Sequence, residues 1–389
     1  MNERQITPSL FATGVADTTL DLFEGQYRVP NGITYNSYFL SDEKTVLFDT
    51  ADRRVAAEWL AGVEQTAGDR GIDYLVVSHM EPDHSAAIRL LADRYPAMRI
   101  VGNAKTFQMM RAFFGRDFGD RAVVVGEGDA LETGAHTIRF YMAPMVHWPE
   151  VMVSFDERDG VLFSADAFGR FGLPGDAGDC ADEERRYYVN IVGKYGSSVQ
   201  TLLKKLSGLP VKTICPLHGP VLTGDLSAYL EKYDVWSSYR PEERGVLIAY
   251  TSIYGNTASA ALRLRDMLAR RGEKRVAVVD LARGDISRAV ADAFRYDALV
   301  LAASSYDGGV FPPMAAFLSR LKAKNWQKRT AAVIENGSWA PSAGKTMLAA
   351  LAEMKEIALP APTVTIRSAV SQETVEALNT LADALAARG

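Results

Sequence analysis

The stretch Tyr74-Leu-Val-Val-Ser-His79-Met-Glu81-Pro-Asp83-His84 decides how the first half of this chain is interpreted. An apolar strand runs directly into a segment that contains two histidines and two acids. Imidazole and carboxylate groups are common protein ligands of transition metals. Four such groups directly after one buried strand are hard to explain by structural needs alone, so the stretch predicts a metal site.

Three more potential ligands lie elsewhere in the chain, each just beyond the carboxyl end of an apolar strand. They are His147, Asp166 and His218. Loops at that end of a sheet are common places for binding sites, so we expect these residues to join the first four. His136 precedes a strand instead, and we interpret it as a histidine of a turn or of the surface.

Seven ligands are too many for one four-coordinate metal but suit two metals that share a carboxylate. The set can divide into His79, Glu81 and His147 for one ion, Asp83, His84 and His218 for the other, and Asp166 as the bridge. With one bridging hydroxide, three carboxylates offset the charge of two divalent ions in a poorly solvated cleft. Ligand type alone leaves iron, manganese and zinc open. We expect no catalytic residue beyond the metal ligands.

Short β-rich segments follow one another closely in the first half of the chain, with few helices between them. This pattern predicts a sheet-on-sheet core that is covered by helices. The expected strands are residues 35–40, 44–49, 74–78, 99–102, 122–125, 137–142, 151–155 and 161–164. The expected helices are residues 53–66, 85–94 and 104–114.

The pattern changes after a polar, proline-containing segment, residues 237–244, which we interpret as a linker. Apolar runs then alternate with segments of helical length, which predicts a parallel sheet buried on both faces. The runs are residues 246–250, 276–280, 298–303, 331–334 and 364–366. Five such units are typical of a flavodoxin-like doubly wound sheet. We therefore expect two domains, residues 1–243 and 244–389.

Three loops of the second half are expected at one edge of this sheet, and they combine hydroxyl groups, glycines and aromatic rings. The first opens a helix, whose N–H groups and positive end suit a phosphate. The other two supply Tyr306 and Trp339, which can contact a planar ring unless they pack in the core. No Gly-x-Gly-x-x-Gly follows the first strand, so NAD is not expected. The candidate flavin-binding residues are Thr251, Ser252, Ile253, Tyr254, Gly255, Asn256, Thr257, Ser305, Tyr306, Asp307, Gly308, Gly309, Asn336, Gly337, Ser338 and Trp339.

The metal motif resembles the metallo-β-lactamase pattern His-x-His-x-Asp-His, with Glu81 in place of the second histidine. Together with the three later ligands, it is similar to the di-iron domain of flavodiiron proteins. Other similar stretches are Tyr35-Asn-Ser-Tyr, His147-Trp-Pro-Glu, Asp166-Ala-Phe-Gly and Leu217-His-Gly-Pro-Val. The loop at residues 251–257 resembles the phosphate loop of flavodoxins, which bind FMN. The resemblance implies an N-terminal αββα sandwich with two non-haem irons and a C-terminal five-stranded FMN-binding domain.

The resemblance also implies an activity, the reduction of O2 to water or of NO to N2O. Two irons and one FMN can supply the four electrons that O2 needs, whereas two NO molecules need two. A rubredoxin-type protein fed from NADH is the implied electron donor. The implied assembly is a head-to-tail homodimer, or a tetramer. The loop from Ala303 to Gly309 departs from the usual Ser-Pro-Thr-Tyr-Asn-Asn-Gly, because Asp307 adds a negative charge.

Composition excludes several classes of function. The formal net charge of −5, without a basic block, argues against nucleic acids and anionic membranes as partners. Two cysteines are too few for a disulfide framework or a rubredoxin-type iron site. No signal sequence or long apolar run is present, so we expect a cytoplasmic protein. The alternatives are a zinc hydrolase joined to a flavodoxin-like module and an electron carrier without metals; Glu81 and the complete ligand set argue against both.

Overall fold

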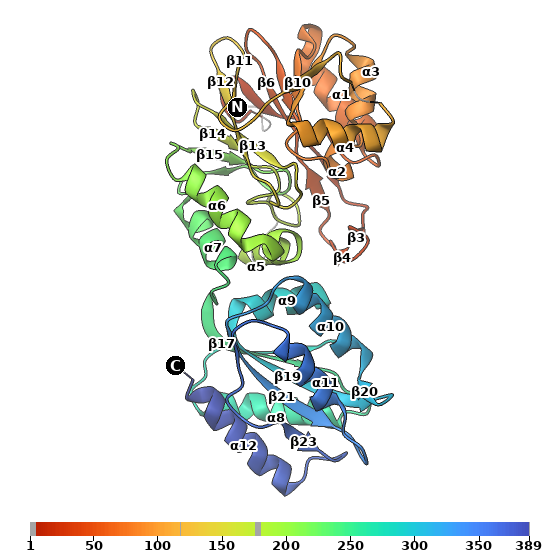
Figure 1. Ribbon diagram of the computed structural model, residues 1–389, viewed down its shortest axis with the longest axis vertical. Helices are drawn as coiled ribbons and strands as arrows, with labels where there is room; N and C mark the ends of the chain where they lie inside the picture. The colour runs from red at the N-terminus through yellow and green to blue at the C-terminus, as the bar shows by residue number, and fades with distance from the viewer. Residues whose placement is uncertain (1–4, 117, 176–179, 389) are drawn as a thin grey trace. The chain divides into compact units, whose positions relative to one another are not determined.

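The computed structural model describes residues 5–116, 118–175 and 180–388 (Figure 1). The chain divides into two compact units, one up to Asp234 and the other from Val235. Helix α7 (Ser227–Ser237) spans this division, whereas the sequence placed the domain boundary later, between residues 243 and 244.

The first unit contains two six-stranded mixed sheets. The first sheet has the order β1 (Leu10–Ala12), β6 (Tyr38–Leu40), β7 (Val46–Phe48), β8 (Tyr74–Val76), β9 (Arg99–Gly102) and β10 (Ala122–Val124). From β7 to β10 its strands are parallel, so the carboxyl ends of these strands meet at one edge. The second sheet has the order β11 (Ala130–Glu132), β12 (Thr137–Met142), β13 (Met152–Asp156), β14 (Val161–Phe163), β15 (Thr213–Cys215) and β16 (Leu222–Thr223).

The two sheets pack face to face through alternate apolar side chains. Phe48 of β7 stacks on Phe163 of β14, with ring centroids 3.7 Å apart and planes 8° apart. Figure 1 shows α1 (Ala56–Ala67), α3 (Ile88–Arg94) and α4 (Ala104–Phe114) beside the first sheet, and α6 (Gly196–Leu206) and α7 beside the second. The αββα sandwich implied by the resemblance is therefore confirmed.

Some helices of the first unit differ from the expectation. The helix expected at residues 85–94 is two helices, α2 (Pro82–Ser85) and α3, because Ala87 interrupts the run with ψ near zero. The region after residue 180, for which the sequence predicted no element, forms α5 (Cys180–Tyr187), a π-helical turn (Tyr188–Val192) and α6. Two short ribbons were also not predicted: β2 (Val15–Asp17) with β5 (Ile33–Tyr35), and β3 (Leu22–Phe23) with β4 (Tyr27–Arg28).

The second unit is the expected doubly wound sheet. Its parallel strands have the order β18 (Val276–Asp280), β17 (Glu243–Tyr250), β19 (Tyr296–Tyr306), β21 (Arg329–Asn336) and β23 (Val364–Ile366). This order, 2-1-3-4-5, is that of flavodoxin-like sheets. A short strand, β22 (Ile357–Ala358), pairs with the beginning of β21, and β20 (Gly309–Val310) pairs with the end of β19.

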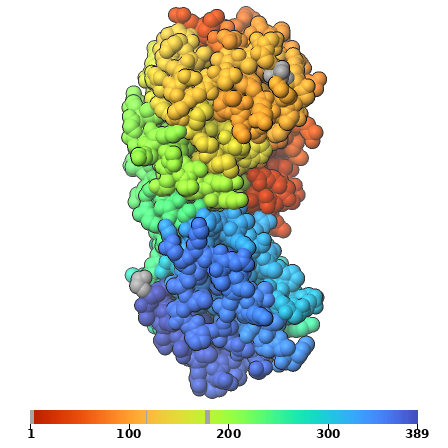
Figure 2. Space-filling view, in the orientation of Figure 1, coloured from red at the N-terminus to blue at the C-terminus, as the bar shows by residue number. Residues whose placement is uncertain are grey.

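Helices cover both faces of this sheet. Helices α8 (Asn256–Arg270) and α12 (Gln372–Ala386) contact each other over one face, and their leucines pack with Val246, Ile248 and Val300. Helices α9 (Ile286–Arg295), α10 (Pro312–Ala323) and α11 (Ala343–Ala352) form the other layer. Figure 2 shows the surface atoms of this unit, coloured cyan to blue. No helix in the described ranges is long and apolar enough to cross a membrane.

Candidate metal centre and cofactor pocket

A buried carboxylate fixes the loop that begins the metal motif. Asp49 follows β7, and its Oδ1 accepts backbone hydrogen bonds from Ser78 at 2.7 Å and His79 at 3.3 Å. Asp49 has a φ of +54°, a backbone conformation that residues other than glycine rarely adopt. Burial raises the pKa of Asp49 to about 6, although the Ser78 and His84 groups oppose this rise. The loop then enters α2, where Pro82 occupies the first turn and orients Asp83 and His84.

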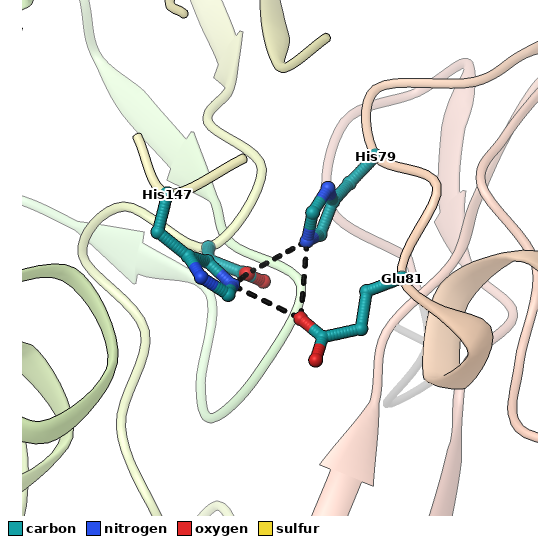
Figure 3. Close-up of side chains that lie close together, drawn as sticks. His79, Glu81 and His147 are labelled. Carbon is teal, nitrogen blue, oxygen red and sulfur yellow. Dashed lines mark hydrogen bonds and ion pairs between the residues drawn. The ribbon is translucent and has the colours of Figure 1, made fainter. Parts of the chain in front are cut away.

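The first group of ligand atoms comprises His79, Glu81, His147 and Asp166. His79 Nε2 lies 3.2 Å from Glu81 Oε2, and His147 Nε2 lies 3.0 Å from the same oxygen. Figure 3 shows these three side chains pointing toward one another, His79 and Glu81 from one loop and His147 from another. Side chains from three separate parts of the sequence thus meet at one point.

The second group comprises Asp83, His84 and His218. His84 Nε2 and His218 Nε2 lie 3.0 Å apart, and Asp83 Oδ2 lies 3.3 and 3.2 Å from them. His218 Nδ1 donates to the backbone oxygen of Thr34 at 2.6 Å, which leaves its Nε2 free to face the group.

Asp166 connects the two groups through its two oxygens. Oδ2 lies 2.9 Å from His147 Nε2 and 3.4 Å from His79 Nε2. Oδ1 lies 3.4 Å from His84 Nε2 and 3.9 Å from His218 Nε2. The structure therefore brings all seven sequence-predicted ligands together, with Asp166 between two sets of three.

The charges of these groups shift one another's titration. Burial alone would lower the pKa of His147, but Asp166 and Glu81 outweigh burial and raise it to about 9. Burial alone would raise the pKa of Glu81, but His147 and His79 lower it to about 2. The pKa of Asp166 also falls well below its ordinary value, since nearby His79 and His147 outweigh its burial. These shifts favour a protonated His147 beside ionised Glu81 and Asp166 when no metal is bound.

The residues fit a pair of metal ions. Both oxygens of Asp83, Oδ1 of Asp166 and Nε2 of His147 are buried and have no hydrogen-bond partner among the described residues. Ligand bonds of about 2.1 Å would place neighbouring ligand atoms about 3.0 to 3.4 Å apart, which agrees with the separations above. A cation in each group would satisfy atoms that protein donors leave unpaired.

His136 lies outside this centre and is buried, which corrects its interpretation as a histidine of a turn or of the surface. It does follow a turn, but it is only 2% exposed. Its Nδ1 lies 2.9 Å from Asp156 Oδ2, and its Nε2 lies 2.9 Å from Ser9 Oγ. Both ring nitrogens are thus in contact with protein groups that can form hydrogen bonds. Asp159 also lies close to His136 and Asp156.

The second unit has a cavity of about 540 Å³ at the carboxyl edge of its sheet. This volume is within the usual range for cofactor sites. All sequence-predicted flavin residues line the cavity except Thr251, Gly255 and Gly309. Thr251 is fully buried, Gly255 caps α8 with a φ of +93°, and Gly309 lies in β20. Four lining residues were not predicted: Ser304, Ala340, Ser342 and Ser368.

The lining of this cavity has the chemistry of a flavin phosphate and ring. Hydroxyl groups gather near the beginning of α8, where Thr257 Oγ1 lies 3.0 Å from Ser304 Oγ. Trp339 is 89% exposed and Tyr306 is 45% exposed, so neither packs in the core. Among the described lining residues, Asp307 is the one with a charged side chain, and it adopts a φ of +47°.

A glycine allows two of the loops to approach closely beside the cavity. A Cβ atom on Gly337 would lie 2.8 Å from Pro341 Cα and 3.0 Å from Ser305 Oγ. The first of these is a backbone atom and cannot move aside alone. The shape of the cavity therefore depends on this position being glycine.

Two buried carboxylates near the metal centre were not identified as functional from the sequence. Asp49 carries no local signal, because its role depends on a loop about 30 residues away. Glu150 belongs to the His147-Trp-Pro-Glu stretch that was already noted, and its position three residues after a predicted ligand was an available signal. Its Oε1 lies 2.8 Å from His79 Nδ1.

Comparison with known proteins finds similar chains. A family model described as ODP family beta lactamase matches residues 33–219. The chain is similar to a rubredoxin-oxygen oxidoreductase of Megalodesulfovibrio gigas, with 28% identity over 99% of this chain and 98% of that one. It is also similar to a nitric oxide reductase of Moorella thermoacetica, with 28% identity over 92% of each chain.

A solved structure matches both units. It is the rubredoxin oxygen:oxidoreductase from Desulfovibrio gigas, with a TM-score of 0.92, 27% sequence identity, and coverage of 98% of this chain and 97% of that one. The likeness extends over the unit that holds the metal ligands and over the unit that holds the cavity.

Proposed function

The chain belongs to the flavodiiron proteins, and from this we propose that it reduces O2 or NO at two irons held in the first unit, with electrons relayed through FMN in the second. The observation that carries this proposal is the position of Asp166, whose two oxygens each face one group of ligands. The relatives named for O2 and for NO reduction leave either substrate, or both, for this chain.

The proposed ligands divide as the geometry groups them. They are His79, Glu81 and His147 for one iron, Asp83, His84 and His218 for the other, and Asp166 for both. The irons, when bound, supply two electrons and open positions for a small diatomic molecule. The chain contributes burial and orientation: Thr34 and Glu150 hold the outward nitrogens of His218 and His79, so each ring presents Nε2.

We propose that FMN occupies the cavity of the second unit, with its phosphate at the beginning of α8 and its ring beside Tyr306 and Trp339. An electron donor of the rubredoxin type is proposed from the name of the Megalodesulfovibrio gigas relative. The first unit, Met1–Asp234, is roughly 45 Å across by its number of residues. A flavin in the second unit can therefore be too far from the irons of its own chain. For this reason we propose a head-to-tail homodimer, or a tetramer, in which the flavin of one chain serves the irons of another.

Purified protein from iron-sufficient cells is expected to contain two irons per chain and to consume O2 in air or NO under anaerobic conditions. One chemically reduced donor should be used for both gases, with iron and zinc measured on the same sample. The ratio of the two rates identifies the preferred substrate. Active protein that contains two zincs per chain and consumes neither gas would contradict the proposal and favour a hydrolase.

The FMN proposal predicts a yellow protein with about one FMN per chain. Gly337→Ala should lower the affinity for FMN by about tenfold or more, because its Cβ overlaps Pro341 and displaces the loop that lines the cavity. Gly208→Ala is the matched control, since a Cβ there has no atom within 4 Å. Affinity is measured by fluorescence titration of FMN into flavin-free protein. Bound FAD, or unchanged FMN affinity in Gly337→Ala, would refute this placement.

A further inference from the structure

Glu150 is a buried carboxylate that contacts the metal centre from behind. Its side chain has no exposed area, and its Oε1 lies 2.8 Å from His79 Nδ1. The same oxygen accepts the backbone N–H of Met80 at 2.8 Å. Asn103 Nδ2 donates to the backbone oxygen of Glu150 at 2.6 Å, so the main chain at this residue is also held.

This contact determines which nitrogen of His79 can bind a metal. A carboxylate accepts a hydrogen bond, so His79 Nδ1 carries a proton, and Nε2 is the nitrogen that can offer a lone pair to a metal. That Nε2 faces Glu81 and Asp166, at 3.2 and 3.4 Å. A carboxylate behind a histidine also makes the ring a stronger donor to a metal.

Two other histidines of the centre, His218 and His84, lack such support. His218 Nδ1 donates to a neutral carbonyl, that of Thr34. His84 Nδ1 is buried and has no hydrogen-bond partner in the described part of the chain. Among the described residues, the Glu150 carboxylate contacts His79 of the first group, whereas neither His84 nor His218 of the second group has such a contact. The two groups of ligands are therefore unequal.

The charge of Glu150 adds to the negative charge around the site. Glu81, Asp83 and Asp166 supply three carboxylates among the seven ligands, and Glu150 is a further buried carboxylate in contact with one of those ligands. Glu150 Oε2 is buried without a partner among the described residues, so little else there compensates its charge. A nearby cation stabilises a buried anion of this kind.

We propose that Glu150 is a positioning residue that fixes the tautomer of His79 and makes the His79–Glu81–His147 group the tighter of the two metal positions. This inference rests on the proposed ligand set and deepens it. Glu150 itself does not touch the metal, since His79 lies between them.

The test is a calorimetric titration of metal-free protein with Zn²⁺, which has no redox chemistry to complicate the measurement. Glu150→Gln keeps an acceptor for His79 and Met80 but removes the charge. We expect it to weaken one of two binding steps by about 10- to 100-fold and to leave the other within about threefold. His147→Asn identifies the affected step, because it should remove the same one.

The chain offers a matched control at His136. Asp156→Asn removes the charge from another buried carboxylate that contacts a histidine Nδ1, at 2.9 Å, away from the seven ligands. Both Zn²⁺ steps should stay unchanged in this variant. If Glu150→Gln does not fold without metal, Glu150→Asp replaces it and should weaken the same step.

Three results would overturn the inference: no change in Glu150→Gln, equal weakening of both steps, or the same loss in Asp156→Asn. Equal weakening together with a lower melting temperature would identify Glu150 as a general structural residue. The metal-free unsubstituted protein should bind two Zn²⁺ ions, and the iron-loaded protein should reduce O2 or NO. If both results are obtained, the proposed function stands whatever Glu150→Gln shows. Failure to bind two ions would instead count against the ligand set itself.

Discussion

Asp166→Asn is expected to empty both metal positions and to abolish the reduction of O2 and NO together. Asp166 Oδ2 faces His147 and His79, whereas Oδ1 faces His84 and His218. An amide keeps the size, but it presents one oxygen and one N–H group, which repels a cation. The site would also carry excess positive charge in a buried place. Metal content should fall below one ion per chain, and turnover should fall by about 100-fold or more.

His147→Asn provides the comparison within the same centre. His147 belongs to one group only, so its loss should weaken mainly one metal. FMN content should remain normal in both variants, because the cavity lies in the other unit. Iron, flavin and turnover are measured per chain for each variant. If Asp166→Asn retains two irons and near-normal turnover, the bridging role is wrong and the ligand set must be revised.

The second large effect is a steep rise of metal affinity with pH. In the metal-free protein the pKa of His147 is about 9, above its ordinary 6.5, because Asp166 and Glu81 outweigh the effect of burial. Below pH 9 this ring holds a proton that a metal must displace. Apparent affinity should therefore rise about tenfold per pH unit for each displaced proton, and the contribution of His147 should level off above pH 9. Between pH 6 and 8 the rise should be about 100-fold or more.

The stability of the metal-free protein should change in the opposite direction. The proton on His147 stabilises the folded state fully below pH 6.5, and this stabilisation is lost as the pH rises through about 9. The measurements are competition with a chelator of known affinity and thermal melting with and without Zn²⁺. In His147→Asn the slope of affinity against pH should drop by one proton. A flat pH profile in the unsubstituted protein would show that no protonated histidine occupies the centre.

The sequence predicted which seven side chains lie together, because each of them follows an apolar strand. Parallel strands place their carboxyl ends at one edge of a sheet, so the residues after β7 and β8 lie together in the first sheet, as do those after β14 and β15 in the second. The same regularity predicted the doubly wound sheet, whose strands are continuous apolar runs. In both cases a local pattern was sufficient, because the geometry of the sheet determines where the loops after its strands lie.

Other features depend on contacts that no local pattern reveals. His136 is buried because Asp156, at the end of the adjacent strand β13, accepts its Nδ1 proton, and the sequence gives no sign of this pairing. The helices after residue 180 contain many charged and aromatic residues, and the buried Arg186 donates hydrogen bonds to Glu183 and to the Arg28 carbonyl. Ser368 reaches the cavity from a loop after β23 that carries no glycine-rich signal.

The single charge in the cavity has a thermodynamic consequence. A flavin whose ring lies there, as proposed, gains negative charge when it becomes the hydroquinone anion, and Asp307 repels this anion more than the neutral oxidised ring. The cavity would then bind oxidised FMN more tightly than hydroquinone, and by the closed cycle that links binding to reduction this difference lowers the midpoint potential. Because Asp307 is exposed, water screens the repulsion and keeps the difference modest. The flavin is thereby made a stronger reductant toward the irons.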